Sequence, residues 1–339
     1  MNDQQPAGPL RHPTVSDVAA AAGVSTSTVS RALRESPLIN ERTRLKVLDA
    51  MRELGYAPSA VARSLRTRSS PFVGVIVPDV ALDFFATALK GAQDVLEPAG
   101  YQVLLMNSER DPAKETAALS TLVSHRVAGI LLASSGGYVP CGVPVVFFDQ
   151  LAVPPGAGDG EVLFDNRKGT DLLVGHLIEH GHRRIAYVGG PRGHTSADER
   201  REAFQSAISE AGLDLPGDYV QAGDDHWSED SGEQATAALL GLPEPPRAIV
   251  AGSEILAVGA LRTLRNAGVS VPQDMALVCF DDPRLGDVLD PPMTAIALHA
   301  REAGGRAAAV LLQRLQGPHP RVEVRIPAEL VVRRSCGCS

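Results

Sequence analysis

The stretch TVSDVAAAAGVSTSTVSRAL, residues 14–33, decides the fold at the start of this 339-residue chain. Its apolar residues recur at helical spacing, and Gly23 separates them into two short runs. Thr14 and Ser25 precede the two runs as candidate N-caps, and Asp17 completes a capping-box pattern with Thr14. Two short helices joined by a glycine turn predict a helix-turn-helix, in which the second helix enters the major groove of DNA.

A third helix is predicted to run from Asn40, its candidate cap, to Gly55, a typical helix end. The apolar residues that repeat about every three positions along it are Leu45, Leu48, Met51 and Leu54. In the second helix, the motif places Thr26, Ser27 and Arg31 toward the DNA bases. The alternative is a solvated helix face without a partner.

The stretch at 14–33, together with GYAPSAVARSLR at residues 55–66, resembles the lactose-repressor (LacI/GalR) family of bacterial transcription regulators. The resemblance implies that Thr26, Ser27 and Arg31 read bases, and Arg31 suits a bidentate bond with guanine. It also implies that the protein binds pseudo-palindromic double-stranded operator DNA as a homodimer. The residues it places against phosphates are Thr14, Ser25, Arg34, Asn40 and Thr43.

Residues 58–71 are the predicted hinge helix and linker that follow the head, residues 14–57, and its flexible arm, residues 1–13. A helix this short is marginal alone, because nucleation is costly. The resemblance implies that it orders on the operator and enters the minor groove through Ala62, Leu65 and Arg66, with Leu65 as a wedge between base pairs. The alternative is a structureless linker.

The charge of the chain is divided between its parts. The whole sequence has 32 Lys and Arg against 40 Asp and Glu, a net charge of −8. Residues 1–71 carry ten of the basic and six of the acidic residues, net +4, so the remainder is net −12. A basic head on an acidic body agrees with DNA binding through the head alone.

Beyond the hinge, short β-rich runs such as 72–77 and 143–148 alternate with amphipathic stretches such as 112–125 and 257–267. This alternation predicts an α/β body of doubly wound parallel sheets, and it contains too many units for one sheet. We therefore expect a two-lobed body that resembles a periplasmic binding protein. The expected boundaries are 72–163 with 294–321 for the N-lobe, 164–293 with 322–335 for the C-lobe, and a tail at 336–339.

Ligands of such folds bind beyond the carboxyl ends of the strands, where this sequence places acids, an arginine and aromatic residues. Matched position by position, the resemblance to the family implies an effector cleft lined by residues of this kind, and the expected effector-binding residues are Phe84, Phe85, Asp149, Arg200, Trp227, Ser253 and Asp281. Core packing for the phenylalanines and helix capping for the aspartates are the alternatives. The sequence departs from the family at Ser253-Glu254, where relatives carry Asn-Asp. This difference leaves open which ligand binds and whether one binds at all.

Other classes of protein fit the sequence less well. A solute-binding transport protein would need an export signal and no DNA-binding head, and an enzyme would need a nucleophile or cofactor motif. We expect no cofactor and no metal: Cys336-Gly337-Cys338 lacks further ligands, and His180 and His182 lack a third. No apolar run is long enough for a membrane span, so we expect a cytoplasmic protein.

The sequence therefore predicts a transcription regulator, a repressor above all, whose operator affinity is controlled by a small molecule bound between two lobes. Asp149, Asp281 and Trp227 favour a sugar or sugar derivative, since acidic oxygens accept from hydroxyls and a ring face stacks on C–H groups. A purine or another metabolite that acts as corepressor is the alternative, and the sign of the coupling stays open.

Overall fold

The computed structural model of the chain describes residues 13–33, 36, 38–56, 70–151, 160–222, 227–317 and 319–338. The chain divides into two compact units, Met1–Ser70 and Pro71–Ser339. We call the first the head and the second the body, and each is described by itself. The expected arm and most of the expected hinge, including Ala62, Leu65 and Arg66, lie outside the described residues, as does Arg34.

In the described part of the head there are three helices, each of which begins at a side-chain cap. They are α1 (Val15–Ala22), α2 (Thr26–Ala32) and α3 (Glu41–Leu54). Thr14 and Asp17 form the predicted capping box of α1. Ser25 caps α2 by accepting from the Thr28 amide at 3.1 Å, and Asn40 caps α3 by accepting from the Thr43 amide at 2.8 Å. These caps satisfy amide groups that a short helix otherwise leaves unbonded.

The buried face of α3 differs from the predicted repeat. Val47, Ala50 and Met51 pack with Val18 and Val29 in the core of the head. The other members of the repeat are largely exposed, namely Leu45, Leu48 and Leu54. Residues placed at every third position drift around a helix of 3.6 residues per turn. Residues whose spacing alternates between three and four positions stay on one face.

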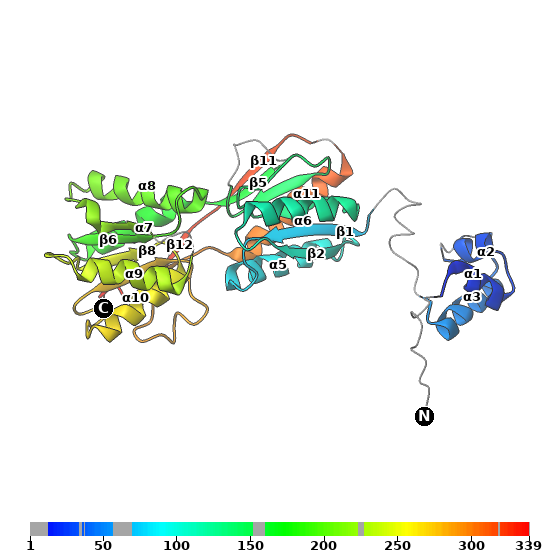
Figure 1. Cartoon of the computed structure of the whole chain (residues 1–339), viewed down its shortest axis with the longest axis horizontal. Helices are drawn as coiled ribbons and strands as arrows, with labels where there is room; N and C mark the ends of the chain where they lie inside the picture. The colour runs from blue at the N-terminus through cyan, green and yellow to red at the C-terminus, as the bar shows by residue number, and fades with distance from the viewer. Residues whose placement is uncertain are drawn as a thin grey trace, which may run out of the picture. The chain divides into compact units, whose positions relative to one another are not determined.

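The N-lobe of the body is a sheet of six parallel strands in the order β11-β5-β4-β3-β1-β2. Its strands are β1 (Phe72–Val77), β2 (Gln102–Asn107), β3 (Ile130–Leu132), β4 (Val145–Phe148), β5 (Gly160–Phe164) and β11 (Val322–Ile326). Helices α5 (Asp83–Leu96) and α11 (Ala300–Gln316) cover one face, and α6 (Pro112–Ser124) covers the other (Figure 1). Gly91 and Gly304 let α5 and α11 approach so closely that neither position has room for a Cβ.

The C-lobe repeats this strand order as β12-β10-β9-β8-β6-β7, with β12 as an antiparallel edge strand. Its strands are β6 (Ile185–Gly189), β7 (Val220–Ala222), β8 (Ala248–Ala251), β9 (Ala276–Phe280), β10 (Thr294–Ala297) and β12 (Glu329–Val331). Helices α7 (Asn166–Glu179) and α8 (Thr195–Glu210) pack on one face, and α9 (Glu229–Leu240) and α10 (Glu254–Asn266) on the other. Both lobes thus have helices on both sheet faces, as the alternation predicted.

The chain passes between the lobes three times, after β5, after β10 and after β11. The strand order corrects the expected boundaries, because residues 294–297 pair with β9 in the C-lobe, whereas residues 322–326 pair with β5 in the N-lobe. Two of the crossing segments touch, since the Asp165 amide donates to the Ile326 carbonyl at 3.0 Å.

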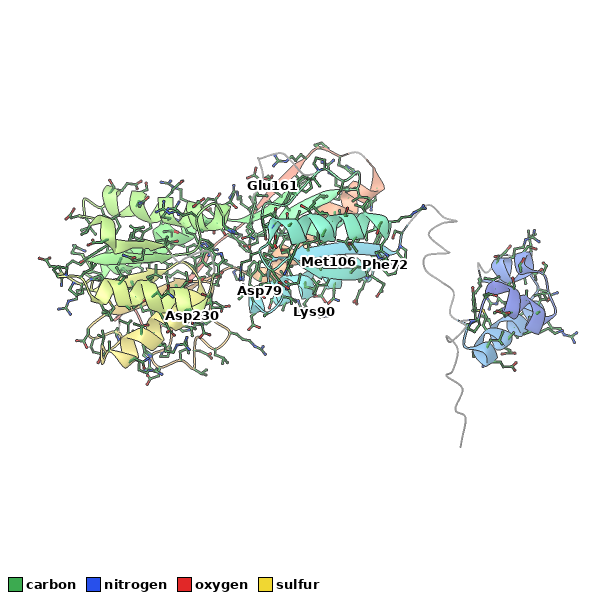
Figure 2. All side chains as sticks on the ribbon, viewed as in Figure 1. Phe72, Asp79, Lys90, Met106, Glu161 and Asp230 are labelled. Carbon is green, nitrogen blue, oxygen red and sulfur yellow. A yellow bond between two sulfur atoms is a disulfide. The ribbon has the colours of Figure 1, made fainter. Side chains whose placement is uncertain are left out.

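The carboxyl ends of the strands in the N-lobe point toward the C-lobe. Figure 2 shows this for β1: Phe72, its first residue, lies at the far end, and Asp79, just after the strand, lies where the lobes face each other. Among the residues that the structure describes, no helix has the length and apolar character needed to cross a membrane.

Candidate effector cleft and DNA-binding surface

The predicted base-reading residues lie together at one end of the exposed surface of the head. Thr26 and Ser27 form the first turn of α2, Arg31 lies about one turn later, and all three side chains are exposed. Val29 and Ala32, on the opposite face of α2, are buried in the core of the head. The helix is thus anchored by one face while the other presents two hydroxyls and a guanidinium.

Three of the predicted phosphate-binding residues are the helix caps themselves. Thr14, Ser25 and Asn40 occupy the N-cap positions of α1, α2 and α3, and Thr43 lies in the first turn of α3. The first amides of a helix carry partial positive charge and suit an anion such as phosphate. The helix starts therefore supply amide donors beside these side chains.

A cleft between the lobes of the body holds the second predicted group of residues. It contains about 600 Å³ of space, part of which is open to solvent. All seven expected effector-binding residues line it: Phe84, Phe85, Asp149, Arg200, Trp227, Ser253 and Asp281. The two sheets place them there because the residues that follow β4, β8 and β9 meet at the facing strand ends.

Arg200 is the most tightly held side chain of the cleft. It projects from α8, is 3% exposed, and lies over the Phe280 ring, with Cζ 4.1 Å from the ring centroid. Its Nε donates to Oδ1 of Asn166 at 2.9 Å, and its Nη1 donates to the Gly252 carbonyl at 2.7 Å. Nη1 also lies 3.7 Å from Oδ2 of Asp281. The guanidinium is therefore fixed in place by the protein alone.

Asp149 and Asp281 occupy equivalent positions in the two lobes, each directly after a buried strand and each with left-handed backbone (φ 64° and 62°). Burial raises the pKa of Asp149 to about 7, although the charge of Arg200 opposes the rise. Burial also raises the pKa of Asp281, again against Arg200. Among the described residues, Oδ1 of Asp281 is buried without a hydrogen-bond partner, so it is available to a ligand donor.

Ser253 and Glu254, the departure from the family pattern, both line the cleft. The Ser253 hydroxyl caps α10 by accepting from the Leu256 amide at 3.5 Å. Burial, followed by the negative charges of Asp281, Asp83 and Asp282, raises the pKa of Glu254 to about 7. The lining of the cleft thus includes three acidic side chains, Asp149, Glu254 and Asp281.

The aromatic residues divide into core and lining. Phe85 is 5% exposed and packs edge-on against Phe84 and Phe148. Most of its surface therefore belongs to the core, which was the alternative to effector binding. Phe84 is half-buried and presents more surface to the cleft. Trp227 lies so close to Gly190 that a Cβ there would overlap the indole ring. The turn after β6 therefore holds one side of the indole.

Sequence reasoning missed part of the lining, although these residues also lie near strand ends or helix starts. The missed residues are Pro78, Leu82, Arg110, Gln150, His194, Ser196, Glu254 and Ile255. Arg110 pairs with Asp79 at 3.3 Å, and His194 contacts Oε1 of Gln150 at 3.4 Å. These residues follow β1, β2, β4, β6 and β8, so their position after predicted strands could have identified them from the sequence.

A helix-turn-helix head joined to a two-lobed body with a polar cleft defines a ligand-controlled DNA-binding regulator. Residues 14–59 match the model of bacterial regulatory proteins of the lacI family, and residues 174–336 match a periplasmic binding protein-like domain. The chain belongs to the lacI family. It is a transcription regulator that binds DNA through its head and a small-molecule effector through its body.

Individual relatives cover nearly the whole chain. The ribose operon repressor of Escherichia coli (strain K12) is 35% identical over 90% of this chain and 94% of its own. The transcriptional repressor CytR of the same strain is 32% identical over 95% and 96%. The lac repressor dimer bound to operator and the anti-inducer ONPF superposes with a TM-score of 0.84 at 28% identity, over 96% of this chain and 99% of that one.

Proposed function

We propose that this regulator is a homodimeric repressor whose effector is a monosaccharide or a close polyol relative, held in the cleft by Arg200, Asp149 and Asp281. The observation that carries the proposal is the unpartnered, buried Oδ1 of Asp281 beside the fixed guanidinium of Arg200. The first offers an acceptor and the second a donor, and adjacent sugar hydroxyls can satisfy both.

The number of acidic side chains favours a hydroxyl-rich ligand over a purine. Asp149, Glu254 and Asp281 supply acceptors from both lobes, and a sugar carries a donor on each hydroxyl to match them. Trp227 and Phe84 offer apolar faces that suit either kind of ring. A purine carries few donors, so most of these buried carboxylates would stay unsatisfied.

In the proposed mechanism, the effector draws the lobes together, since its contacts come from Asp149 on one lobe and Asp281 and Arg200 on the other. The three crossing segments then bend, the paired hinge segments at 58–71 separate or lose order, and operator affinity falls. The ribose operon repressor, by its name, acts on an operon for a sugar, which supports both the ligand class and the repressor role.

A thermal-shift screen of the full chain tests the ligand class. Pentoses and hexoses are expected to raise the melting temperature, because a ligand at 100 times its Kd stabilises the folded state by about 2.7 kcal/mol. The same sugar should then release operator DNA in a fluorescence-anisotropy titration. Stabilisation by purines with no response to sugars would contradict the proposed ligand, and tighter operator binding with sugar would contradict the proposed mechanism.

Asp149→Asn is expected to stabilise the ligand-free chain at alkaline pH. Because the folded-state pKa of about 7 lies above the unfolded value, the folded state binds more protons between about pH 4 and 7, and its stability falls as pH rises through that window. Removing the ionisable group should raise the melting temperature by roughly 5 °C at pH 8. The gain should shrink toward pH 4, where the carboxyl of the folded state is protonated and no charge is buried.

Differential scanning fluorimetry across this pH range measures the effect. The control is Asp214→Asn, which removes an exposed aspartate. A gain that does not depend on pH, or an equal gain in the control, would show that Asp149 does not carry an unfavourable buried charge.

Arg31→Ala is expected to weaken binding to an operator selected from random DNA. Loss of one bidentate contact to a base costs about 1–3 kcal/mol, or roughly 5- to 150-fold per half-site, and should relax preference at one base pair. Anisotropy titrations on the selected site and on single-base variants measure both effects. Arg52→Ala is the matched control, because Arg52 is exposed on α3 and pairs with Asp49. Equal losses on every sequence would instead assign Arg31 to a phosphate contact.

A further inference from the structure

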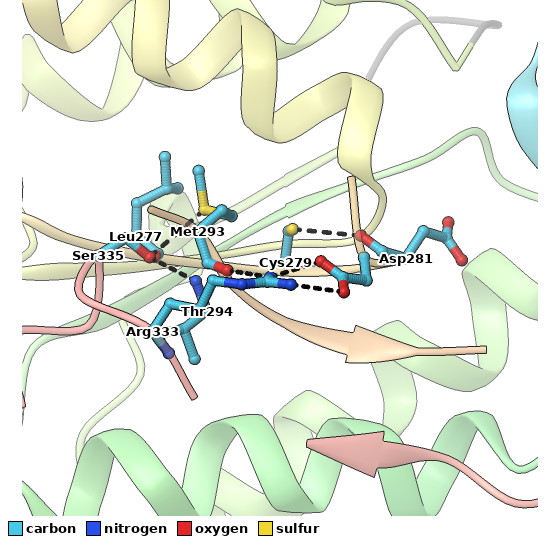
Figure 3. Close-up of polar contacts among 8 residues, drawn as sticks. Leu277, Cys279, Asp281, Met293, Thr294, Arg333 and Ser335 are labelled. Carbon is cyan, nitrogen blue, oxygen red and sulfur yellow. Dashed lines mark hydrogen bonds and ion pairs between the residues drawn. The ribbon is translucent and has the colours of Figure 1, made fainter. Parts of the chain in front are cut away.

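The C-terminal segment of the chain is built into the C-lobe. Ser335 is fully buried; its hydroxyl binds the Leu277 carbonyl and accepts from the Thr294 amide at 2.9 Å (Figure 3). Arg333, two residues earlier, donates to Oδ2 of Asp282 at 2.8 Å. The prediction of a tail from residue 336 is therefore wrong for Cys336, which is 0% exposed.

This anchoring brings two thiols against a histidine that is far away in sequence. The Sγ of Cys338 lies 3.4 Å from Nε2 of His176, near the end of α7. The ligand atoms of His176, Cys336 and Cys338 all lie within 4.8 Å of one another. Sequence reasoning held that the Cys-Gly-Cys segment had no further ligands, and the fold supplies one.

The distance between the Cys338 sulfur and the His176 nitrogen, and the burial of His176, fit a pair of metal ligands. The donors of a tetrahedral zinc site lie roughly 3.5–3.8 Å apart, given Zn–S of about 2.3 Å and Zn–N of about 2.0–2.1 Å. His176 is 8% exposed, so its ring is held by packing. Both sulfur atoms lie near the backbone of the same segment, since the Sγ of Cys336 is 3.3 Å and the Sγ of Cys338 is 3.8 Å from the Arg333 carbonyl oxygen.

Two further imidazoles surround the group. The ring of His180 lies 4.4 Å from that of His176, centroid to centroid. Nε2 of His182 lies 3.2 Å from the Cys336 carbonyl oxygen. Three histidines and two cysteines thus occupy one corner of the C-lobe, separate from the effector cleft.

We propose that the chain in its dithiol form binds one Zn²⁺ through His176, Cys336 and Cys338, with water in the fourth position. Thiolate and imidazole together select zinc among the common divalent cations, and the two thiols release their protons when they bind it. The structure joins the two cysteines as a disulfide, and that oxidised form cannot chelate the ion. The segment can therefore either form the disulfide or bind zinc, but not both at once.

Bound zinc would attach the C-terminal segment to α7. That segment carries Arg333, whose guanidinium holds Asp282, and Asp282 adjoins Asp281 of the cleft. The ion is thus expected to stabilise the C-lobe, because it binds the folded arrangement that brings His176 to the two cysteines, which are far from it in the unfolded chain.

Metal analysis of the untagged full chain tests the proposal. The protein is reduced with a phosphine, stripped with a chelator, and titrated with Zn²⁺ or with Co²⁺, whose bond to thiolate gives a charge-transfer absorption. We expect about one ion per chain at micromolar metal and a higher melting temperature with Zn²⁺. Cys338→Ser and His176→Gln should each weaken binding at least about tenfold.

Cys141→Ser is the matched control, because Cys141 is a half-buried thiol in the N-lobe. It should bind the ion as the unmodified chain does. Absence of binding in the reduced chain, undiminished binding by Cys338→Ser, or Co²⁺ binding without the thiolate absorption would each overturn the proposal.

Discussion

Arg200→Met is expected to abolish the response to effector while operator binding persists. The substitution keeps an apolar side chain over Phe280 but removes the guanidinium that binds Asn166, the Gly252 carbonyl and Asp281. Asp281 and Asp149 would then lose the positive charge that opposes the rise of their pKa values on burial. Loss of one partner from a buried charged pair costs about 2–5 kcal/mol, equivalent to roughly 30- to 5,000-fold in effector Kd.

Calorimetric titration with the sugar found in the thermal screen measures this loss, and anisotropy measures operator binding. Arg201→Met is the control, because Arg201 neighbours Arg200 on α8 but pairs with Asp198 at 2.6 Å. An Arg200 variant that binds effector within threefold of the unmodified chain would exclude Arg200 as a ligand residue. A variant that also loses operator binding would indicate a structural role instead.

The second large effect concerns the head. A chain of residues 71–339 is expected to lose all measurable affinity for the operator, at least about 1,000-fold, and to keep its affinity for effector. The body is a compact unit in the structure, so it should fold without the head. It also carries net negative charge, whereas residues 1–71 are net +4. Phosphate repels such a surface, so nothing in the body compensates for the missing contacts.

Anisotropy at several salt concentrations measures this loss. The full chain should show affinity that falls steeply with salt, and the body alone should show no binding at any salt concentration tested. Residual salt-dependent binding by the body would place part of the DNA-binding surface outside the head.

Local rules predicted the head and most of the cleft. Caps at Thr14, Ser25 and Asn40 depend on residue type and neighbours only, so they could be identified without the fold. The rule that parallel strands present their carboxyl ends at one edge indicated Asp149 and Asp281 without any knowledge of pairing. Arg200, which lies within α8, was identified through the resemblance to the family.

Predictions that required long-range pairing were wrong or incomplete. The exchange of β10 and β11 between lobes depends on which strand each one pairs with, and the local sequence of neither strand identifies its partner. The ligand group at His176 joins α7 to residues about 160 positions later, so no spacing within the sequence could indicate it. Glu254 was passed over because its perturbed pKa comes from burial and from carboxylates of other segments.

The placement of β11 has a consequence for how the chain folds as it is synthesised. β11 closes the N-lobe sheet beside β5, but it follows every strand of the C-lobe except β12. While the ribosome makes residues 166–321, the β5 edge remains open and can pair with other chains. The N-lobe therefore cannot finish folding first although most of its strands are made first, and slow translation through the C-lobe would prolong exposure to aggregation.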